Sequence, residues 1–364
     1  MSTMLIVGLL IATILVVFVD AGSWKLHIQE VKRVQRNNTL GPLNDVYSEV
    51  LDFGRDKYRA TVYVGSPPQP FHVTVDTGSN ILWVPKKGCK ATGEYLIGNC
   101  KSSKYVYNPR GSATGKNLNQ PFRIAYGDGS ATITGHYYRD VFSFGEKMRL
   151  KEPITFGVGE EMKHRDQGIL GLGNAVNSNE HGTSILHEAW RQKLIDAPIF
   201  TMYLRKCPRS EDCEKHGTIT IGSYDKEMCG KIEGHVKFST RQCSCKSIFQ
   251  SNNGLGRASI YIPSNYYKPL MEAIKASLTD KGRYVVDCDA YVAISLRING
   301  IEYVIPGNQV LVNLHTNYCL LRIYPFDFDN GTWLLGNPFG TTYCQTHNIE
   351  TQTIEFAPAL TRYD

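Results

Sequence analysis

Short apolar stretches broken by turn residues run through most of the chain, with the alternation of apolar and polar positions that is typical of β-strands. Residues 58–65, Tyr-Arg-Ala-Thr-Val-Tyr-Val-Gly, alternate in this way and end at the turn sequence Ser-Pro-Pro-Gln-Pro of residues 66–70. A second run, Phe-His-Val-Thr-Val at 71–75, follows directly. The same pattern of short apolar stretches and turn residues returns at 135–144, so the sequence predicts hairpins and a mostly β fold.

Helical periodicity is rare by comparison. It is clearest at 183–193 and at 266–278, where Pro-Ser-Asn at 263–265 provides a start signal. Two similar signatures of apolar residues followed by glycine stand in the two halves, Gly-Ile-Leu-Gly-Leu-Gly at 168–173 and Trp-Leu-Leu-Gly-Asn at 333–337. These features predict two copies of a β unit, joined near residues 207–217.

The N-terminal segment departs from the strand pattern. Residues 5–19 are apolar apart from Thr13, and Asp-Ala-Gly-Ser at 20–23 is a boundary at which a signal peptidase could cut. A type II membrane anchor is the alternative, but the run is shorter than the about 20 residues that span hydrocarbon. We expect a signal peptide at 1–22, no stable membrane span after its cleavage, and a secreted or lysosomal protein.

The next segment is basic and ends at a break. Residues 24–38 carry four Lys or Arg residues against Glu30 alone, and Gly-Pro follows at 41–42. A short basic pro-segment and an ordinary polar leader both fit this composition. We assign residues 23–50 as a short pro-segment or linker.

Length and charge narrow the function classes. A chain of 364 residues with 42% hydrophobic residues can fill two medium-sized cores, which predicts two domains. The formal charge of +6 is spread over scattered residues, without the basic block or basic-aromatic stripe of a nucleic-acid-binding protein. We therefore expect no nucleic-acid partner.

Ten cysteines indicate an oxidising compartment and disulfide bonds. Their spacing lacks the CxxC pairs and clustered histidines of a zinc site, so we expect no metal. Asn37 and Asn330 each begin an Asn-x-Thr acceptor for N-glycosylation.

A carboxylate follows the predicted strand at 71–75. Asp76 is succeeded by Thr77, Gly78 and Ser79, so that a tight turn is possible at the glycine and two hydroxyls can hydrogen-bond the acid. By itself, an aspartate at such a junction is more often a turn cap than a catalytic group. The surrounding sequence changes that interpretation.

The segment Asp-Thr-Gly-Ser-Asn-Ile-Leu-Trp-Val-Pro at 76–85 resembles the first active-site segment of the pepsin-like aspartic proteases. Further matching pieces follow in family order, and the resemblance spans about residues 58–358, looking most like the nematode branch. The pieces are Gly-Ser-Pro-Pro-Gln at 65–69, Tyr-Gly-Asp-Gly-Ser at 126–130, the glycine signature at 168–173, Trp-Leu-Leu-Gly-Asn-Pro-Phe at 333–339 and Ile-Glu-Phe-Ala-Pro at 354–358.

The resemblance implies a bilobal pepsin-like fold in which two pseudo-symmetric β lobes flank a cleft. We expect an N-terminal lobe at 51–210, with Asp76 and a flap, and a C-terminal lobe at 211–364. Asp76 takes the place of the first catalytic aspartate. Thr77, Gly78, Ser79, Tyr126 and Gly127 take substrate-binding positions, and no cofactor is implied.

The family's chemistry needs a second aspartate. Two carboxylates that lie close together share one proton, so that one activates a water molecule while the other donates to the scissile carbonyl. The second family segment, Asp-Thr-Gly-Thr-Ser-x-x-x-Gly-Pro, corresponds here to residues 254–263, which places Gly254 at the aspartate. No Asp or Glu lies between Glu233 and Glu272, so a shifted alignment supplies no acid. Arg257 at a threonine position is a second departure.

Some cysteine pairs are also implied. Cys89 and Cys100 flank a loop and are expected to pair, while Cys245 with Cys288 and Cys319 with Cys344 resemble family bridges. The remaining four cysteines, Cys207, Cys213, Cys229 and Cys243, allow three pairings.

Three functional hypotheses follow. The first is a catalytically inactive, monomeric homologue that binds a peptide or protein ligand in the cleft. The second is an active acid endopeptidase whose sequence here has a mis-assembled segment near 242–259. The third, a homodimer that supplies Asp76 from both chains, is disfavoured because the second lobe would obstruct the interface.

Overall fold

The computed structural model describes most of the chain from residue 57 onward and a few short segments before it. The described residues are 14–20, 23–29, 47–50, 52–54, 57–77, 79–92, 100, 105–126, 131–145, 148–163, 168–173, 184–205, 217–237, 259–280, 282–313, 317–326, 333 and 335–360. The chain divides into two compact units, one formed by residues 42–261 and 332–364, the other by residues 1–41 and 262–331. The lobe boundaries at 51–210 and 211–364 stay a prediction.

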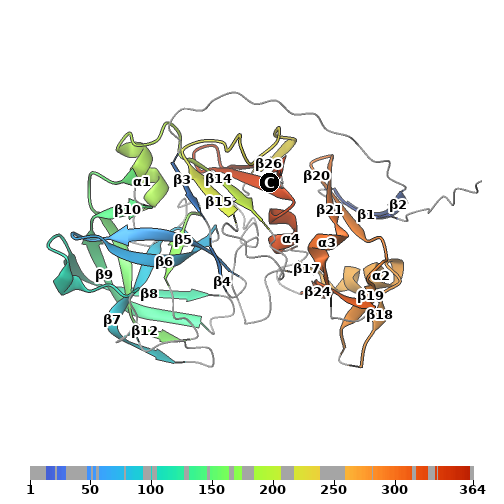
Figure 1. The fold of residues 1–364 in the computed structure, drawn as a ribbon, viewed down its shortest axis with the longest axis horizontal. Helices are drawn as coiled ribbons and strands as arrows, with labels where there is room; N and C mark the ends of the chain where they lie inside the picture. The colour runs from blue at the N-terminus through green and yellow to red at the C-terminus, as the bar shows by residue number, and fades with distance from the viewer. Residues whose placement is uncertain are drawn as a thin grey trace, which may run out of the picture. The chain divides into compact units, whose positions relative to one another are not determined.

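A ten-stranded sheet holds the strands between residues 52 and 171 (Figure 1). Its spatial order is β11-β10-β5-β6-β13-β7-β12-β9-β8, with β4 paired to β5. The strands are β4 (Asp52–Gly54), β5 (Lys57–Val64), β6 (Gln69–Asp76), β7 (Leu82–Thr92), β8 (Lys116–Tyr126), β9 (Ala131–Asp140), β10 (Phe142–Phe144), β11 (Met148–Arg149), β12 (Ile154–Lys163) and β13 (Ile169–Gly171). The strands expected at 58–65, 71–75 and 135–144 are therefore confirmed.

Most pairs in this sheet are antiparallel, but β13 runs parallel to β6 and β12 runs parallel to β7. Parallel neighbours need both faces covered, and β6 shows this directly, because Val73, Thr74, Val75 and Asp76 are all buried. The sequence Val-Thr-Val-Asp at 73–76 alternates apolar and polar residues, yet all four of these residues are buried.

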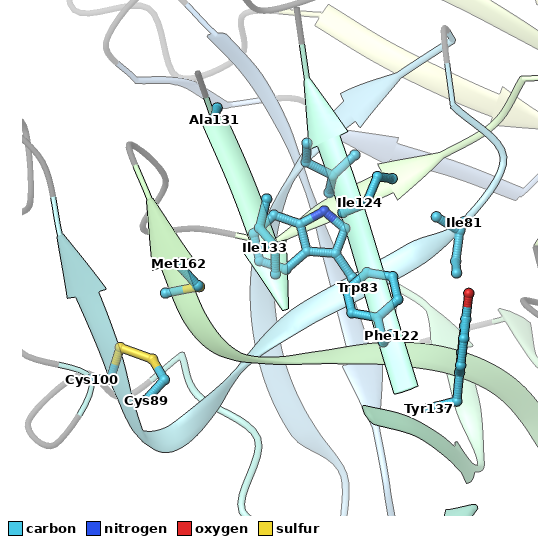
Figure 2. Close-up of a cluster of buried hydrophobic side chains, with 11 residues drawn as sticks. Ile81, Trp83, Cys89, Cys100, Phe122, Ile124, Ala131, Ile133, Tyr137 and Met162 are labelled. Atoms are coloured by element: carbon cyan, nitrogen blue, oxygen red, sulfur yellow. A yellow bond between two sulfur atoms is a disulfide. The ribbon is translucent and has the colours of Figure 1, made fainter. Parts of the chain in front are cut away.

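The core of this sheet lies against Trp83, which is fully buried (Figure 2). Ile81 and Ile133 lie in the same cluster, as does the Cys89–Cys100 disulfide. The other members are Phe122, Ile124, Ala131, Tyr137, Met162 and Ile169. The motif Leu-Trp-Val-Pro at 82–85 is thus a core strand, and its residues support the preceding turn through packing.

A six-stranded antiparallel sheet belongs to the same unit, in the order β16-β26-β25-β14-β15-β3. Its strands are β3 (Tyr47–Val50), β14 (Ile199–Leu204), β15 (Gly217–Ile221), β16 (Gly234–Lys237), β25 (Tyr343–Asn348) and β26 (Thr353–Pro358). Segments far apart in sequence therefore meet in one sheet, since β14 pairs with β25.

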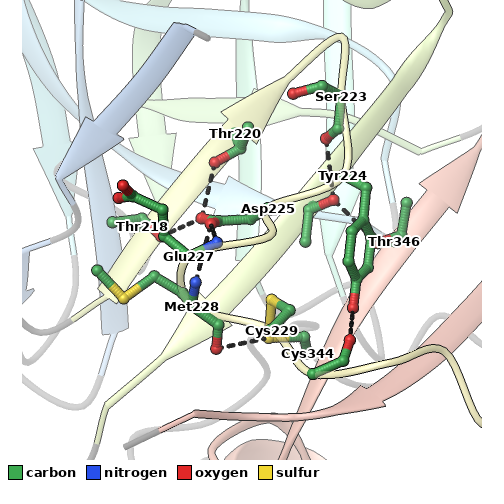
Figure 3. The surroundings of a disulfide bond; sticks show 12 residues. Thr218, Thr220, Ser223, Tyr224, Asp225, Glu227, Met228, Cys229, Cys344 and Thr346 are labelled. Atoms are coloured by element: carbon green, nitrogen blue, oxygen red, sulfur yellow. Dashed lines mark hydrogen bonds between the residues drawn. A yellow bond between two sulfur atoms is a disulfide. The ribbon is translucent and has the colours of Figure 1, made fainter. Parts of the chain in front are cut away.

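Asp225 organises the turn that follows β15 (Figure 3). Its carboxylate accepts hydrogen bonds from the hydroxyls of Thr218 (3.2 Å) and Thr220 (3.0 Å). It also accepts from the backbone N–H groups of Glu227 (3.1 Å) and Met228 (3.0 Å). Because these donors satisfy both oxygens, the aspartate is retained in a position that is only 8% exposed.

The other unit holds two four-stranded sheets, ordered β2-β1-β20-β21 and β18-β19-β23-β22. Their strands are β1 (Ile14–Asp20), β2 (Ser23–Gln29), β18 (Ser277–Leu278), β19 (Tyr284–Asp287), β20 (Ala293–Ile298), β21 (Ile301–Pro306), β22 (Leu311–Asn313) and β23 (Tyr318–Leu321). The strand β24 (Ile323–Pro325) also belongs to this unit, and β17 (Ile260–Ile262) ends at its first residue after the boundary, Ile262. The expected signal peptide and pro-segment, which include β1 and β2, stay predictions.

Helices are few among the residues that the structure describes, as expected, and they are short. They are η1 (Pro109–Gly111), α1 (Ile185–Arg191), α2 (Ser264–Ala273), α3 (Gly307–Val310) and α4 (Gly336–Gly340). The helix expected at 183–193 is α1, capped by Ser184, whose side chain accepts a hydrogen bond from the N–H of His187. The helix expected at 266–278 is only partly correct. It ends at Ala273, because Lys275 adopts a positive φ of 57°, which terminates helical geometry.

The two glycine signatures adopt different structures. The first, at 168–173, contains β13. The second leads into α4, where Gly336 has a positive φ of 57° that favours glycine. Similar sequences in the two halves therefore do not mark equivalent described elements.

Three disulfides lie within the described residues, and one of the three expected pairs is confirmed, Cys89–Cys100 with a Cα–Cα distance of 5.3 Å. The expected pairs Cys245–Cys288 and Cys319–Cys344 are wrong. The structure joins Cys288 to Cys319 and Cys229 to Cys344.

Strand register explains the corrected pairs. The N–H of Cys288 donates to the carbonyl of Asn317, which places Cys288 within reach of Cys319 on the neighbouring strand. Cys229 and Cys344 each lie beside β26, opposite Ala359 and Ala357 respectively. Cys207, Cys213, Cys243 and Cys245 lie outside the described residues.

Candidate functional site

Asp76 ends β6 and is 2% exposed. Its neighbours on the strand are buried valines and Thr74, so the sequence places an acid at the edge of an apolar core. A carboxylate in such a position is costly to ionise unless hydrogen bonds compensate for its lost hydration. The structure therefore has to supply donors.

Ser79 is one such donor. Its hydroxyl donates a hydrogen bond of 2.7 Å to Oδ2 of Asp76. A hydrogen bond to an ionised group is stronger than one between neutral partners, and it fixes the carboxylate within its turn. The expectation that a hydroxyl three residues beyond Asp76 contacts the acid is confirmed.

Thr77 behaves differently from the expectation. Its hydroxyl oxygen is buried and has no hydrogen-bond partner among the described residues, so it does not donate to Asp76. Thr77 follows Asp76 directly in the bend after β6, whereas Ser79 lies two residues further along the turn, where its hydroxyl reaches Oδ2 of Asp76. Of the two expected hydroxyl donors, only Ser79 reaches the acid.

The backbone of segment 168–173 is hydrogen-bonded to this turn. Gly171 of β13 lies opposite Asp76 of β6, and the N–H of Leu172 donates to the carbonyl of Asp76 (2.8 Å). The N–H of Gly171 donates to the carbonyl of Ile81 (3.1 Å), and that of Gly173 to the carbonyl of Ser79 (2.7 Å). The backbone of this segment is therefore bonded to the turn at three places.

Two glycines make this close approach possible. A Cβ at Gly171 would lie 2.4 Å from the backbone nitrogen of Ile81, and one at Gly173 would lie 2.7 Å from the carbonyl oxygen of Thr77. No other residue fits without moving the backbone of the Asp76 turn. Sequence reasoning used these glycines as a mark of a repeat and missed their part in positioning Asp76. Alternate glycines within an apolar strand were the available signal.

The expected flap coincides with a hairpin. β8 ends at Tyr126, whose backbone pairs with Ala131 at the start of β9, so the two strands are joined through 127–130. The side chain of Tyr126 and the residues Gly78, Gly127 and Gly254 lie outside the described part of the structure, as do Asn37, Asn330 and Cys245. Their expected roles stay predictions.

The described residues offer neither a metal site nor a spanning helix. Within the described ranges, no three His, Cys, Asp or Glu side chains come together in a group that could hold a metal ion. In the same ranges, no helix has the length and apolar character needed to cross a bilayer.

The turn can therefore offer one buried, hydrogen-bonded carboxylate. Such a group can accept a proton from a water molecule or a hydrogen bond from an amide, but it cannot act as base and acid in the same step. Its chemistry depends on whether a second acid faces it.

Comparison with known proteins supplies the context of this turn. Residues 57–359 match the sequence model described as "Eukaryotic aspartyl protease". The chain is 28% identical to aspartic protease 6 of Caenorhabditis elegans, over 91% of this chain and 89% of the relative. It is 24% identical to aspartic protease 2 of Necator americanus, over 93% and 91% respectively. Human gastricsin is 25% identical over 88% of this chain and 86% of its own length.

Proposed function

Because the chain belongs to the eukaryotic aspartyl protease family, we propose that it is a secreted or lysosomal, monomeric member that binds peptides in its cleft and has lost peptidase activity. One observation carries the loss of activity. The position that corresponds to the second aspartate holds Gly254, and no Asp or Glu occurs between Glu233 and Glu272.

The loss of peptidase activity follows from the different roles of the two carboxyl groups in hydrolysis. Hydrolysis needs one ionised carboxylate to withdraw a proton from water and one neutral carboxyl to donate to the peptide carbonyl. Asp76 can take either role but not both in one step. Groups that act as a unit lose nearly all turnover when one member is removed, so we expect a loss of several orders of magnitude.

Peptide binding relies on parts that do not need the second acid. The Asp76 turn is buried, bonded to Ser79 and backed by segment 168–173. The β8–β9 hairpin is in place beside the expected flap residue Tyr126. These features support a retained binding groove, in which extended peptides gain affinity from the backbone and from side-chain contacts.

An active acid endopeptidase is the second candidate. It is favoured by the intact Asp76 turn, which a chain free of catalytic constraint has no evident need to keep. Under this hypothesis the segment near 242–259 is mis-assembled, and the natural sequence contains an Asp-Thr-Gly at the position of Gly254. Sequencing the transcript across residues 230–270 separates the two candidates, because only the active enzyme encodes that motif.

The activity test uses the folded protein with matched variants. We expect no cleavage of haemoglobin between about pH 2 and pH 7, and partial recovery in Gly254→Asp. The double variant Gly254→Asp/Asp76→Asn is the control and should be inactive, because it carries an acid only at position 254. Cleavage by the unaltered sequence that pepstatin inhibits would refute the proposed loss of activity.

A further inference from the structure

Three neighbouring strands of the ten-stranded sheet lose their register at the same level. In the pairing of β12 with β9, Gly159 lies opposite Gly135 and Glu161 opposite Thr134, which leaves Glu160 as an extra residue. In the pairing of β12 with β7, Gly159 lies opposite Pro85 and Glu161 opposite Lys90. Residues 86–89 of β7 therefore bulge out opposite Glu160. Bulges redirect side chains and are frequent beside functional sites.

Glu160 forms the centre of a charged cluster at this bulge. Its Oε1 lies 2.6 Å from Nζ of Lys86, and its Oε2 lies 3.1 Å from Nδ1 of His136. The side chains of Lys86 and Glu160 are 31% and 29% exposed, so the pair is partly removed from water. Both carboxylate oxygens of Glu160 are used within the protein.

The electrostatics of the pair agree with this geometry. Burial opposes the ionisation of Glu160, but hydrogen bonding and charge from Lys86, together with His136, outweigh it and lower the pKa of Glu160. The hydrogen bond to Glu160 raises the pKa of Lys86, against the opposing effect of burial. Glu160 is therefore an internal counter-ion for Lys86 and a hydrogen-bond partner of His136.

A pocket of about 530 Å³ opens at this cluster. It is lined by Lys86, Lys87, Gly88, Cys89, Lys90, Thr134, Gly135, His136, Glu160 and Glu161. Lysines therefore outnumber glutamates on the lining. Lys90 forms only a long, exposed ion pair with Glu161 (3.6 Å), and no carboxylate of the described residues lies within ion-pair distance of Lys87. Among the residues that the structure describes, the positive charge of Lys87 on this pocket is therefore not neutralised by an ion pair.

Backbone constraints hold the pocket open. A Cβ at Gly135 would lie 1.9 Å from the carbonyl oxygen of Val158, so only glycine allows β9 to pass β12 at this point. Gly88 has a positive φ of 83°, a conformation that favours glycine in the bulged part of β7. The Cys89–Cys100 disulfide ties the same bulge to the chain beyond it. The pocket is therefore a defined part of the fold.

We propose that this pocket binds a saccharide that carries a sulfate or phosphate ester. Lysine ammonium groups suit compact oxyanions such as these esters, and Lys87 and Lys90 supply that charge on the lining. Thr134, His136 and Glu161 offer hydrogen-bonding groups for sugar hydroxyls. The volume lies within the range of small-molecule sites and exceeds the needs of a free ion. This site is separate from the Asp76 turn and does not depend on the proposed function.

Isothermal titration calorimetry with three matched probes tests the proposal. Glucose 6-phosphate and glucose 6-sulfate should each bind saturably at low salt, with Kd on the order of 1 mM or tighter. Glucose, which has the same ring and no ester, should not. Raising the salt concentration should weaken binding, because the lysines lie at an exposed rim. Binding of only one ester supports the proposal and identifies that ester.

Variants that remove positive charge and variants that remove negative charge should change the affinity in opposite directions if charge on the pocket binds the ester. The double variant Lys87→Gln/Lys90→Gln should bind at least about tenfold more weakly. Glu160→Gln should bind more tightly, because it frees the charge of Lys86 from its counter-ion. The control Lys226→Gln/Lys231→Gln removes the same charge from exposed residues outside the pocket and should bind normally. Absence of saturable binding to either ester, or equal loss in both double variants, would overturn the proposal.

Discussion

The hydroxyl of Ser79 donates a 2.7 Å hydrogen bond to the buried carboxylate of Asp76. The bond closes the turn that follows β6 and gives the acid a donor in a position with 2% exposure. Because a buried charge without donors is costly, the hydroxyl of Ser79 offsets part of the cost of burying Asp76. The same two residues connect the stability of the N-terminal sheet with the chemistry that the turn can perform.

Replacing Ser79 with alanine should destabilise the protein by about 1–3 kcal/mol, because it leaves an oxygen of Asp76 without its donor. Urea unfolding at neutral pH measures this change. Ser79→Thr is the control and should cost much less, since it keeps the hydroxyl. Equal costs for the two variants would show that the hydroxyl is not what stabilises the turn.

A methyl group added at Gly171 should lower the free energy of unfolding more than the loss of the Ser79 hydroxyl does. Gly171→Ala would place a Cβ 2.4 Å from the nitrogen of Ile81, and a backbone neighbour cannot move aside as a side-chain end could. We expect a loss of about 3 kcal/mol, at the upper end of overpacking effects. Gly230→Ala is the matched control, because its nearest neighbour would lie at an ordinary contact distance of 3.4 Å. Similar unfolding free energies for the two variants would contradict the close-approach explanation.

Asp225 makes a comparable test in the six-stranded sheet. Asp225→Ala removes the acceptor of two hydroxyls and two backbone N–H groups, and should cost about 3 kcal/mol. Asp225→Asn keeps one carbonyl oxygen, and the threonine hydroxyls can rotate to accept from its amide, so a smaller loss is expected. Urea unfolding distinguishes these variants. A loss as large in Asn as in Ala would mean that charge, rather than hydrogen bonding, holds the turn.

His347 should make the protein less stable in acid. Its ring stacks on Phe200, with centroids 4.6 Å apart, and burial lowers its pKa from 6.5 to about 3. The unfolded chain therefore binds a proton below about pH 6.5 that the folded protein takes up only near pH 3. Stability should fall as the pH drops through this window, by up to about 1.4 kcal/mol per pH unit.

Glutamine at this position tests the histidine effect, because it does not titrate. The loss of unfolding free energy between pH 7 and pH 4.5 should be smaller in His347→Gln than in the unaltered protein, by about 2–3 kcal/mol. His235→Gln, which makes the same substitution at an exposed position, is the control. If His347→Gln has the same pH dependence as the unaltered protein, the ring takes up its proton at the same pH in the folded and the unfolded states, and burial does not lower its pKa.

The sequence predicted strands better than pairings. Alternation identified β5 and β6, and the motif at 76–85 located the buried turn, because both features are local. The disulfides of Cys288, Cys319 and Cys344 were assigned wrongly, since their partners depend on which strands become neighbours in the sheet. The donor role of Ser79 follows from its spacing, whereas the closeness of Gly171 to Ile81 depends on the parallel pairing of β13 with β6.

The pocket at Glu160 was missed for a related reason. Lys86, His136 and Glu160 are separated by tens of residues, and nothing in their local sequence marks them as a group. They meet because β9, β12 and β7 are adjacent strands that lose register together. A bulge shared by three strands has no local sequence signal strong enough to predict the charged cluster that forms there.

A transition-state mimic should reveal whether a second acid faces Asp76. A statine-type peptide gains affinity over the matching amide peptide when its hydroxyl is held between two facing carboxyl groups, as the tetrahedral intermediate would be. With Asp76 alone, we expect the two peptides to bind the unaltered protein within a few-fold of each other. In Gly254→Asp the statine peptide should bind at least about a hundredfold more tightly than the amide, as transition-state analogues do. Competition binding at about pH 4.5, midway between acid and neutral conditions, compares the two ratios. A large preference for the statine peptide in the unaltered protein would mean that a second acid faces Asp76 after all.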